Sequence, residues 1–183
     1  MDPQRKVILL DIVKNASFPF PNIITQNHNQ GILLVEGSTA EIYANKIESN
    51  VKANIAFGGL NSGFTRIKWN NIQGSKSGEG IFVVEGEEKL LIAENTIVEN
   101  ALDGIVMCHS MGIIQDNEIR KNYRNGISAS YETSTIVEEN KITDNKVAGV
   151  QMRDPAMPYL LNNVFSGNGS QIKMTKHAKG QWP

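Results

Sequence analysis

The chain consists of short apolar segments separated by asparagine and glycine, without the apolar spacing of an amphipathic helix. Segments rich in Ile and Val alternate inward and outward positions, as strands with one buried face do. The segments recur at a regular interval. An asparagine opens each repeat, at steps of 22 to 25 residues, at Asn22, Asn45, Asn70, Asn95, Asn117, Asn140 and Asn162.

Each repeat contains three strand-like pieces. An Ile or Val lies two positions after each opening asparagine, a second follows a small or turn-forming residue, as in Gly80-Ile81, and a third precedes the next asparagine by three residues, as at Ile92. Three short strands and three corners per repeat predict an all-β, right-handed, single-stranded parallel β-helix of about seven coils. We expect Ile47, Ile97 and Ile142 to stack in one interior column.

The seven opening asparagines are interpreted as structural. Asparagine tolerates left-handed backbone angles at corners, and stacked amides can hydrogen-bond along the axis of the rod as a ladder. The leading segment, residues 7–15, is expected to be the first strand of the coil that precedes Ile32, because Ile8 lies 24 residues before it. Residues 1–183 are predicted to form a single domain, with repeats over about 7–175 and a tail at 176–183.

The repeats resemble those of pectate-lyase-like parallel β-helix proteins, and most closely the β-helix region of F-box proteins. The blocks at 80–107 and 125–152 carry this resemblance. It implies the β-helix fold, but the same repeat serves hydrolases, lyases, epimerases and non-enzymatic scaffolds. No leading F-box segment and no Cys/His zinc cluster accompany the repeats, so the resemblance implies a repeat module and not a ubiquitin-ligase receptor.

Converging carboxylates, which polysaccharide enzymes on this fold need, are hard to find in the sequence. Glu94, Asp116 and Glu139 form an acidic line just before the corners, but such charges are typical of a solvated surface. The segment Arg66-Ile67-Lys68 resembles a polygalacturonase motif, and Asp154-Pro155 resembles part of an alginate epimerase site; both lack the accompanying acids and histidines. We therefore expect no catalytic residues, no metal site, no cofactor and no enzymatic activity.

The outward side of one strand in each coil is apolar over the first four repeats and carries no acid. It becomes polar farther on, at Ser128, Gln151 and Lys173. A continuous apolar strip on the surface marks an interface unless a terminal segment, such as 17–21 or 176–183, covers it. The apolar strip is predicted to bind a protein partner and consists of Leu33, Val35, Ala56, Phe82, Val84, Val106 and Cys108.

The net charge of −1 argues against nucleic acid and membrane surfaces as partners. A single cysteine, Cys108, suits a reducing compartment, and the N-terminal segment lacks a signal-peptide cleavage pattern. These features favour a cytoplasmic, non-catalytic scaffold subunit of a larger assembly, for example a cytoskeletal or ciliary one. Its predicted partners are other protein subunits. The open ends of the solenoid are available for end-to-end self-association. The alternative is a carbohydrate-binding or polysaccharide-degrading β-helix protein.

Overall fold

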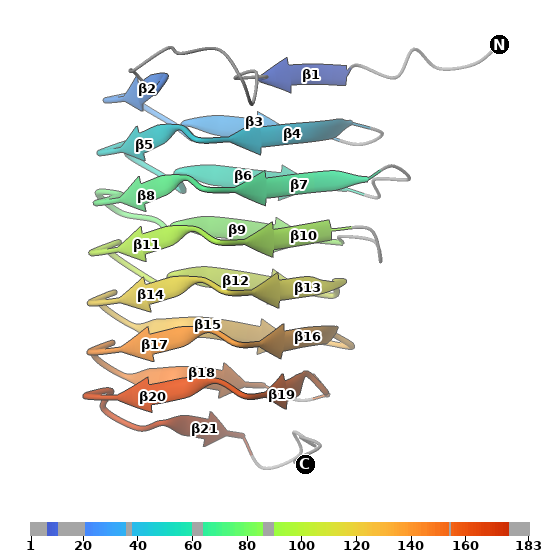
Figure 1. Cartoon of the computed structure of the whole chain (residues 1–183), viewed down its shortest axis with the longest axis vertical. Coiled ribbons are helices and arrows are strands. Elements are labelled where there is room, and N and C mark those ends of the chain that lie inside the picture. Colours follow the sequence, from blue (N-terminus) through green and yellow to red (C-terminus); the bar gives the residue numbers. More distant parts are fainter. Residues whose placement is uncertain are drawn as a thin grey trace, which may run out of the picture.

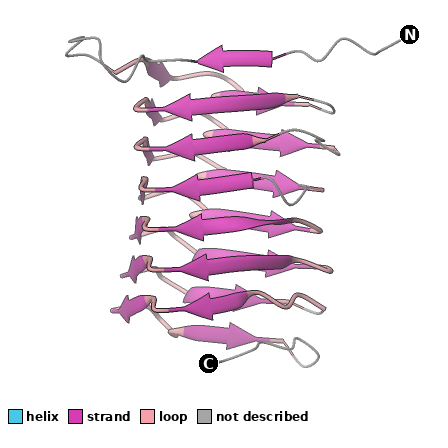
Figure 2. Ribbon diagram, turned by 45° about the vertical axis from the view of Figure 1, so that its right-hand side comes forward, coloured by secondary structure: helices cyan, strands magenta, loops and turns pink. Residues whose placement is uncertain are grey.

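The computed structural model describes residues 7–10, 21–35, 38–59, 64–85, 90–153 and 155–175. Within these ranges every regular element is a strand, and the strands wind as a right-handed parallel β-helix (Figure 1). Three parallel sheets of seven strands each run along the rod, and each strand hydrogen-bonds to its equivalents one coil away (Figure 2). The predicted fold class is confirmed.

Every coil contributes one strand to each sheet. The first sheet contains β1 (Val7–Leu10), β4 (Thr39–Tyr43), β7 (Thr65–Lys68), β10 (Leu90–Ala93), β13 (Met111–Gln115), β16 (Ser134–Glu138) and β19 (Tyr159–Leu161). The second contains β2 (Ile23–Thr25), β5 (Lys46–Glu48), β8 (Asn71–Gln73), β11 (Thr96–Val98), β14 (Glu118–Arg120), β17 (Lys141–Thr143) and β20 (Val164–Ser166). The third contains β3 (Ile32–Leu34), β6 (Ile55–Gly58), β9 (Ile81–Val84), β12 (Ile105–Cys108), β15 (Asn125–Ser130), β18 (Ala148–Met152) and β21 (Ile172–Met174).

Columns of aliphatic side chains fill the interior of the rod. In the second sheet Ile47, Ile97 and Ile142 stand in one line, with Ile72 and Ile119 between them, and each of the five has a relative exposure of 0%. Burial of an isoleucine side chain contributes about 1.5–3 kcal/mol. The predicted column is therefore present and forms the core.

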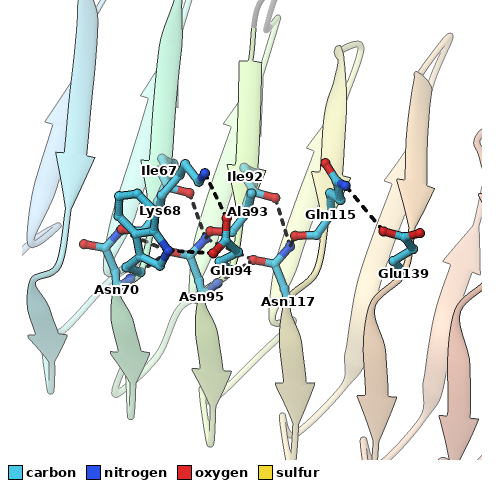
Figure 3. A network of polar contacts seen from close by, with 11 residues as sticks. Ile67, Lys68, Asn70, Ile92, Ala93, Glu94, Asn95, Gln115, Asn117 and Glu139 are labelled. Carbon is cyan, nitrogen blue, oxygen red and sulfur yellow. Dashed lines mark hydrogen bonds and ion pairs between the residues drawn. The ribbon is translucent and has the colours of Figure 1, made fainter.

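Asparagine side chains connect the coils at the corner between the first and second sheets (Figure 3). The Asn70 Nδ2 donates to Asn95 Oδ1 at 3.0 Å, and the backbone N–H of Asn70 donates to the same oxygen at 3.0 Å. The Nδ2 also reaches back to the carbonyl oxygen of Ile42 at 2.8 Å. A buried amide is tolerated only when its donors and acceptor are paired, and this arrangement pairs them.

The last rung of this ladder is Asn163, and the prediction of Asn162 is wrong. Asn140 Nδ2 donates to Asn163 Oδ1 at 3.0 Å. Because side chains alternate between faces, the one-residue shift also places Phe165, and not Val164, opposite Ile142. Two adjacent asparagines made both registers compatible with the repeat. The rungs are Asn22, Asn45, Asn70, Asn95, Asn117, Asn140 and Asn163.

The left-handed backbone angles at this corner belong to the residue before the ladder asparagine, in six of the seven rungs, which corrects the reason given for the asparagines. Glu94 has a φ of 55° before Asn95, and Asn162 has a φ of 52° before Asn163. A left-handed angle costs about 1–2 kcal/mol for an L-residue. The asparagines satisfy backbone groups of their own coil and of the preceding coil, and they reach the next coil through its asparagine side chain.

The leading strand belongs to a different sheet from the one predicted. β1 pairs with β4, so that Ile8 neighbours Ala40 and extends the first sheet. The prediction placed it beside Ile32 in the third sheet because it extrapolated the repeat spacing alone. Residues 11–15 lie outside the described ranges.

Candidate functional site

The apolar strip on the outer side of the third sheet is only partly open to solvent. Leu33 and Val35 are exposed at 48% and 53%, but Ala56 and Val106 are buried at 4% and 9%. Phe82 lies beside both Ala56 and Val106 in register, so stacked outward side chains shield each other along the rod. Phe82, Val84 and Cys108 are half-buried. Of the covering segments considered above, 17–21 and 176–183, all residues except Pro21 lie outside the described ranges, and partner binding by the strip stays a prediction.

Farther along the same sheet the outward positions are polar and recessed. Ser128 and Gln151 follow Val106 in register and are buried at 4% and 8%. Gln151 Oε1 accepts hydrogen bonds from Asn125 Nδ2 at 2.9 Å and from Arg153 Nη2 at 3.3 Å. The third sheet therefore carries a polar cluster beneath its surface.

A buried carboxylate lies at the centre of this cluster. Asp103 is 3% exposed, and its Oδ1 accepts hydrogen bonds from the backbone N–H of Asn125 at 2.9 Å and from Asn125 Nδ2 at 2.7 Å. Its other oxygen, Oδ2, lies 3.9 Å from Arg124 Nη1. Removing a carboxylate from water is costly unless it is paired, and Asn125 and Arg124 provide the partners.

A second carboxylate, Glu79, occupies the equivalent position one coil earlier. Glu79 precedes Gly80-Ile81 as Asp103 precedes Gly104-Ile105, and the Gly80 N–H donates to the Asp103 carbonyl at 3.0 Å. Burial raises the pKa of the Glu79 carboxyl group and outweighs a backbone hydrogen bond that lowers it. The charge of Asp103 raises the pKa further, and Arg124 lowers it slightly. Part of the Glu79 population is thereby held protonated at a higher pH than usual for a glutamate.

One acceptor in the cluster has no partner. Asn125 is fully buried, and its Oδ1 receives no hydrogen bond from any described residue. An unpaired buried acceptor costs about 1–3 kcal/mol, so the described residues leave one polar atom of this cluster unsatisfied. The third-sheet polar network is defined here as Glu79, Asp103, Arg124, Asn125, Gln151 and Arg153.

Sequence reasoning missed this network because it searched only the residues between the inward positions of each strand. That search found no acid, whereas Glu79, Asp103 and Asn125 lie two residues before the inward isoleucines Ile81, Ile105 and Ile127. The signal was their shared place in three successive repeats. A guanidinium group can bind the carboxylate of an anionic sugar, and a carboxyl group beside it can exchange a proton with that sugar.

Two carboxylates of the acidic line expected at the corners, Glu94 and Glu139, form contacts with neighbouring side chains at the surface. Glu94 accepts from Trp69 Nε1 at 2.6 Å and pairs with Lys68 Nζ at 2.9 Å, and Gln115 Nε2 donates to Glu139 at 3.4 Å (Figure 3). Within the described ranges no group of three or more His, Cys, Asp or Glu side chains could hold a metal ion.

Two sequence segments resemble catalytic motifs, Arg66-Ile67-Lys68 and Asp154-Pro155, and their described residues have ordinary structural environments. Ile67 is fully buried in the core, and Arg66 Nη1 pairs with Glu41 Oε1 at 2.6 Å. Asp154 lies outside the described residues, and Pro155 after it is exposed. No helix in the described part of the chain is long and apolar enough to cross a membrane.

Comparison with known proteins defines the class of this chain. It matches the family model of the right-handed β-helix region over residues 21–113 and 103–180, and it belongs to that family. A mannuronan C5-epimerase of Pseudomonas putida is 28% identical over 105 residues, which are 56% of this chain and 20% of the relative. The crystal structure of the periplasmic alginate epimerase AlgG matches with a TM-score of 0.67 at 18% identity and covers 84% of this chain and 44% of that one. At that identity the second likeness shows the fold alone.

These relatives contradict the prediction of a non-catalytic cytoplasmic scaffold. Both are epimerases, one of them periplasmic, so the expected lack of enzymatic activity and the cytoplasmic, cytoskeletal or ciliary location are wrong. The physical cause of the error is the missed polar network, which left the apolar strip as the apparent feature of the third sheet. The predicted protein partners, the end-to-end association and the absence of nucleic-acid and membrane partners stay predictions.

Proposed function

We propose that this chain binds and modifies an acidic, uronate-containing polysaccharide on the outer side of its third sheet. The observation that carries the proposal is the third-sheet polar network, in which the Asp103 carboxylate lies recessed beside the Arg124 guanidinium and the unpartnered oxygen of Asn125. The relative named as a mannuronan C5-epimerase supports a uronate polymer as the substrate class. The finer likeness to the F-box β-helix remains a prediction and assigns no activity.

Burial of the Asp103 carboxylate is better explained by chemistry than by stability. Well-packed apolar residues of similar volume are often as stabilising as a buried ion pair, and the core cluster of this rod is built from apolar side chains. Recessed carboxyl groups whose pKa is shifted by burial and by a neighbouring charge are typical of functional sites. Glu79 has such a shift, caused first by burial and then by Asp103.

The groups present suit proton transfer at a carbon next to a carboxylate. A guanidinium, such as that of Arg124, would bind the uronate carboxylate and so acidify the adjacent C5–H bond. A carboxylate would accept the C5 proton, and a neutral carboxylic acid, the form that the raised pKa of Glu79 favours, would return a proton to the opposite face. One C–H bond breaks and one forms, without an oxidant or reductant.

The test is solvent exchange at C5. Polymannuronate is incubated in D2O with the native protein that contains this chain, and loss of the H5 signal is followed by proton NMR. We expect deuterium incorporation that falls at least about tenfold in Arg124→Gln and Asp103→Asn, because both changes alter transition-state charge. Lys76→Gln, an exposed cation outside the network, is the matched control.

The possible results separate the alternatives. An unsaturated uronate product without epimerisation would assign elimination from the same C5 carbanion. Binding without exchange would restrict the chain to recognition of the polymer. If the protein shows no binding and no exchange, the proposed function is refuted.

A further inference from the structure

A pocket of about 310 Å³ lies at the corner between the second and third sheets. It spans three successive coils, and the corner that contains Tyr123 leads directly into Arg124 of the third-sheet polar network. The pocket is lined by Glu99, Lys121, Asn122, Tyr123, Asp144 and Lys146.

The repeat itself arranges these side chains in two rows. A second asparagine ladder runs along this corner, between the second and third sheets, and includes Asn122 and Asn145. Lys121 and Asp144 directly precede these two asparagines, and the φ angles of Lys121 and Asp144, 54° and 57°, are left-handed. Tyr123 and Lys146 directly follow the same two asparagines. The asparagine ladder, with Asn122 Nδ2 donating to Asn145 Oδ1 at 3.0 Å, therefore fixes the backbone from which both rows project.

An aromatic ring is displayed to solvent in this pocket. Tyr123 is 60% exposed, and Lys146 Nζ lies 5.8 Å from the centre of its ring. Tyrosine offers an apolar face on which the C–H groups of a sugar ring can pack, together with a hydroxyl for hydrogen bonding. The large exposed ring contributes little to the core and is available to a ligand.

Two cations of the pocket have no anionic partner within the described structure. Lys121 and Lys146 form no ion pair with a described residue, although Glu99 and Asp144 line the same pocket. Their ammonium groups can therefore bind an external carboxylate without first breaking a salt bridge. Glu99 and Asp144 can accept hydrogen bonds from sugar hydroxyls.

We propose that this pocket is a subsite for one uronate unit of the polymer, next to the third-sheet polar network. Tyr123 packs against the sugar ring, and Lys121 and Lys146 bind its carboxylate. The inference rests on the proposed function and adds a second contact that holds the chain of sugars as it passes around the corner. It predicts that long oligouronates bind more tightly than short ones.

The experiment compares oligomannuronates of about three and about ten units by calorimetry on the native protein. We expect Tyr123→Ala and the double variant Lys121→Gln/Lys146→Gln to weaken binding of the longer oligomer by about tenfold and to leave the short one nearly unchanged. Tyr131→Ala is the matched control, since Tyr131 is 63% exposed at a different corner. Circular dichroism verifies that each variant keeps the strand signal.

Each result decides between the two proposals. Length-dependent weakening in the pocket variants, absent in Tyr131→Ala, supports the subsite. If the wild-type protein binds both oligomers and Tyr123→Ala binds the longer one equally well, the subsite is refuted while the proposed function stands. If the wild-type protein binds neither, both proposals fail. Binding of an uncharged oligosaccharide of the same length with equal affinity would refute the role of the two lysines.

Discussion

Asn54 bridges a gap that Ser75 leaves in the second asparagine ladder. Asn54 Nδ2 donates to Asn100 Oδ1 at 3.0 Å, and Asn54 Oδ1 accepts from Asn50 Nδ2 at 2.8 Å. In neighbouring coils the residue equivalent to Asn54 is glycine, because a Cβ at Gly80 would lie 2.9 Å from Asn100 Nδ2. A side chain at this position and an asparagine one coil onward exclude each other, and Ser75 makes room for Asn54.

This relationship predicts strong coupling between the two positions. Ser75→Asn alone should destabilise the fold by about 1–3 kcal/mol, because the larger amide overpacks against Asn54. Asn54→Gly alone should cost a similar amount, since the Asn50 and Asn100 amides lose their partner. The double variant restores the regular glycine and asparagine pattern and should lie within about 1 kcal/mol of the wild type. Urea unfolding followed by circular dichroism measures all three; additive effects would contradict the coupling.

The corrected register of the last coil predicts opposite effects at two adjacent residues. Phe165 packs against the core opposite Ile142, whereas Val164 is 61% exposed. Phe165→Ala should lower the free energy of unfolding by about 2–4 kcal/mol, and Val164→Ala should change it by no more than about 0.5 kcal/mol. Thermal or urea unfolding gives both values. A larger loss for Val164→Ala would restore the register that was first predicted.

The corner asparagines give a second test of the same register. Asn163 accepts from Asn140 and donates from Nδ2 to the Val137 carbonyl at 2.7 Å, so Asn163→Ala should cost about 1–3 kcal/mol. Asn162 has a φ of 52° and an exposed side chain. Asn162→Gly should therefore be neutral within about 0.5 kcal/mol, because glycine adopts this angle without strain. Chemical denaturation of the two variants in parallel measures the difference.

The raised pKa of Glu79 predicts a particular pH dependence of stability. With its folded-state pKa above the usual 4.5, the native protein holds a proton that the unfolded chain has already lost. The resulting destabilisation is absent below pH 4.5 and grows as pH rises through the folded-state pKa. Glu79→Gln should therefore stabilise the protein at neutral pH and have little effect in acid. Equal effects at both pH values, measured by urea unfolding, would contradict the shift.

Much of the fold could be predicted because the interior repeats. Ile47, Ile97 and Ile142 recur at the spacing of a coil and must share a column once the coils stack. The spacing failed where it offered two equivalent solutions, as at Asn162 and Asn163, and where a longer interval separates successive strands, as between Ile8 and Ala40.

The candidate site was less accessible to such reasoning. Asp103, Asn125 and Gln151 come from three coils, and nothing in their local sequence indicates that one amide donates to both of the other side chains. Whether Ala56 is open or shielded likewise depends on Phe82 one coil away.

The sequence by itself determined the all-β class, the three strands of each coil and the inward columns, since side-chain alternation and the repeat are properties of neighbouring residues along one chain. The tertiary structure alone decided which polar side chains meet on the third sheet, how Asn54 compensates for Ser75, and where Tyr123 lies relative to Lys121 and Lys146. Those relations connect residues on different coils, and their distances are set by the stacking register, in which a one-residue shift exchanges the inner and outer faces.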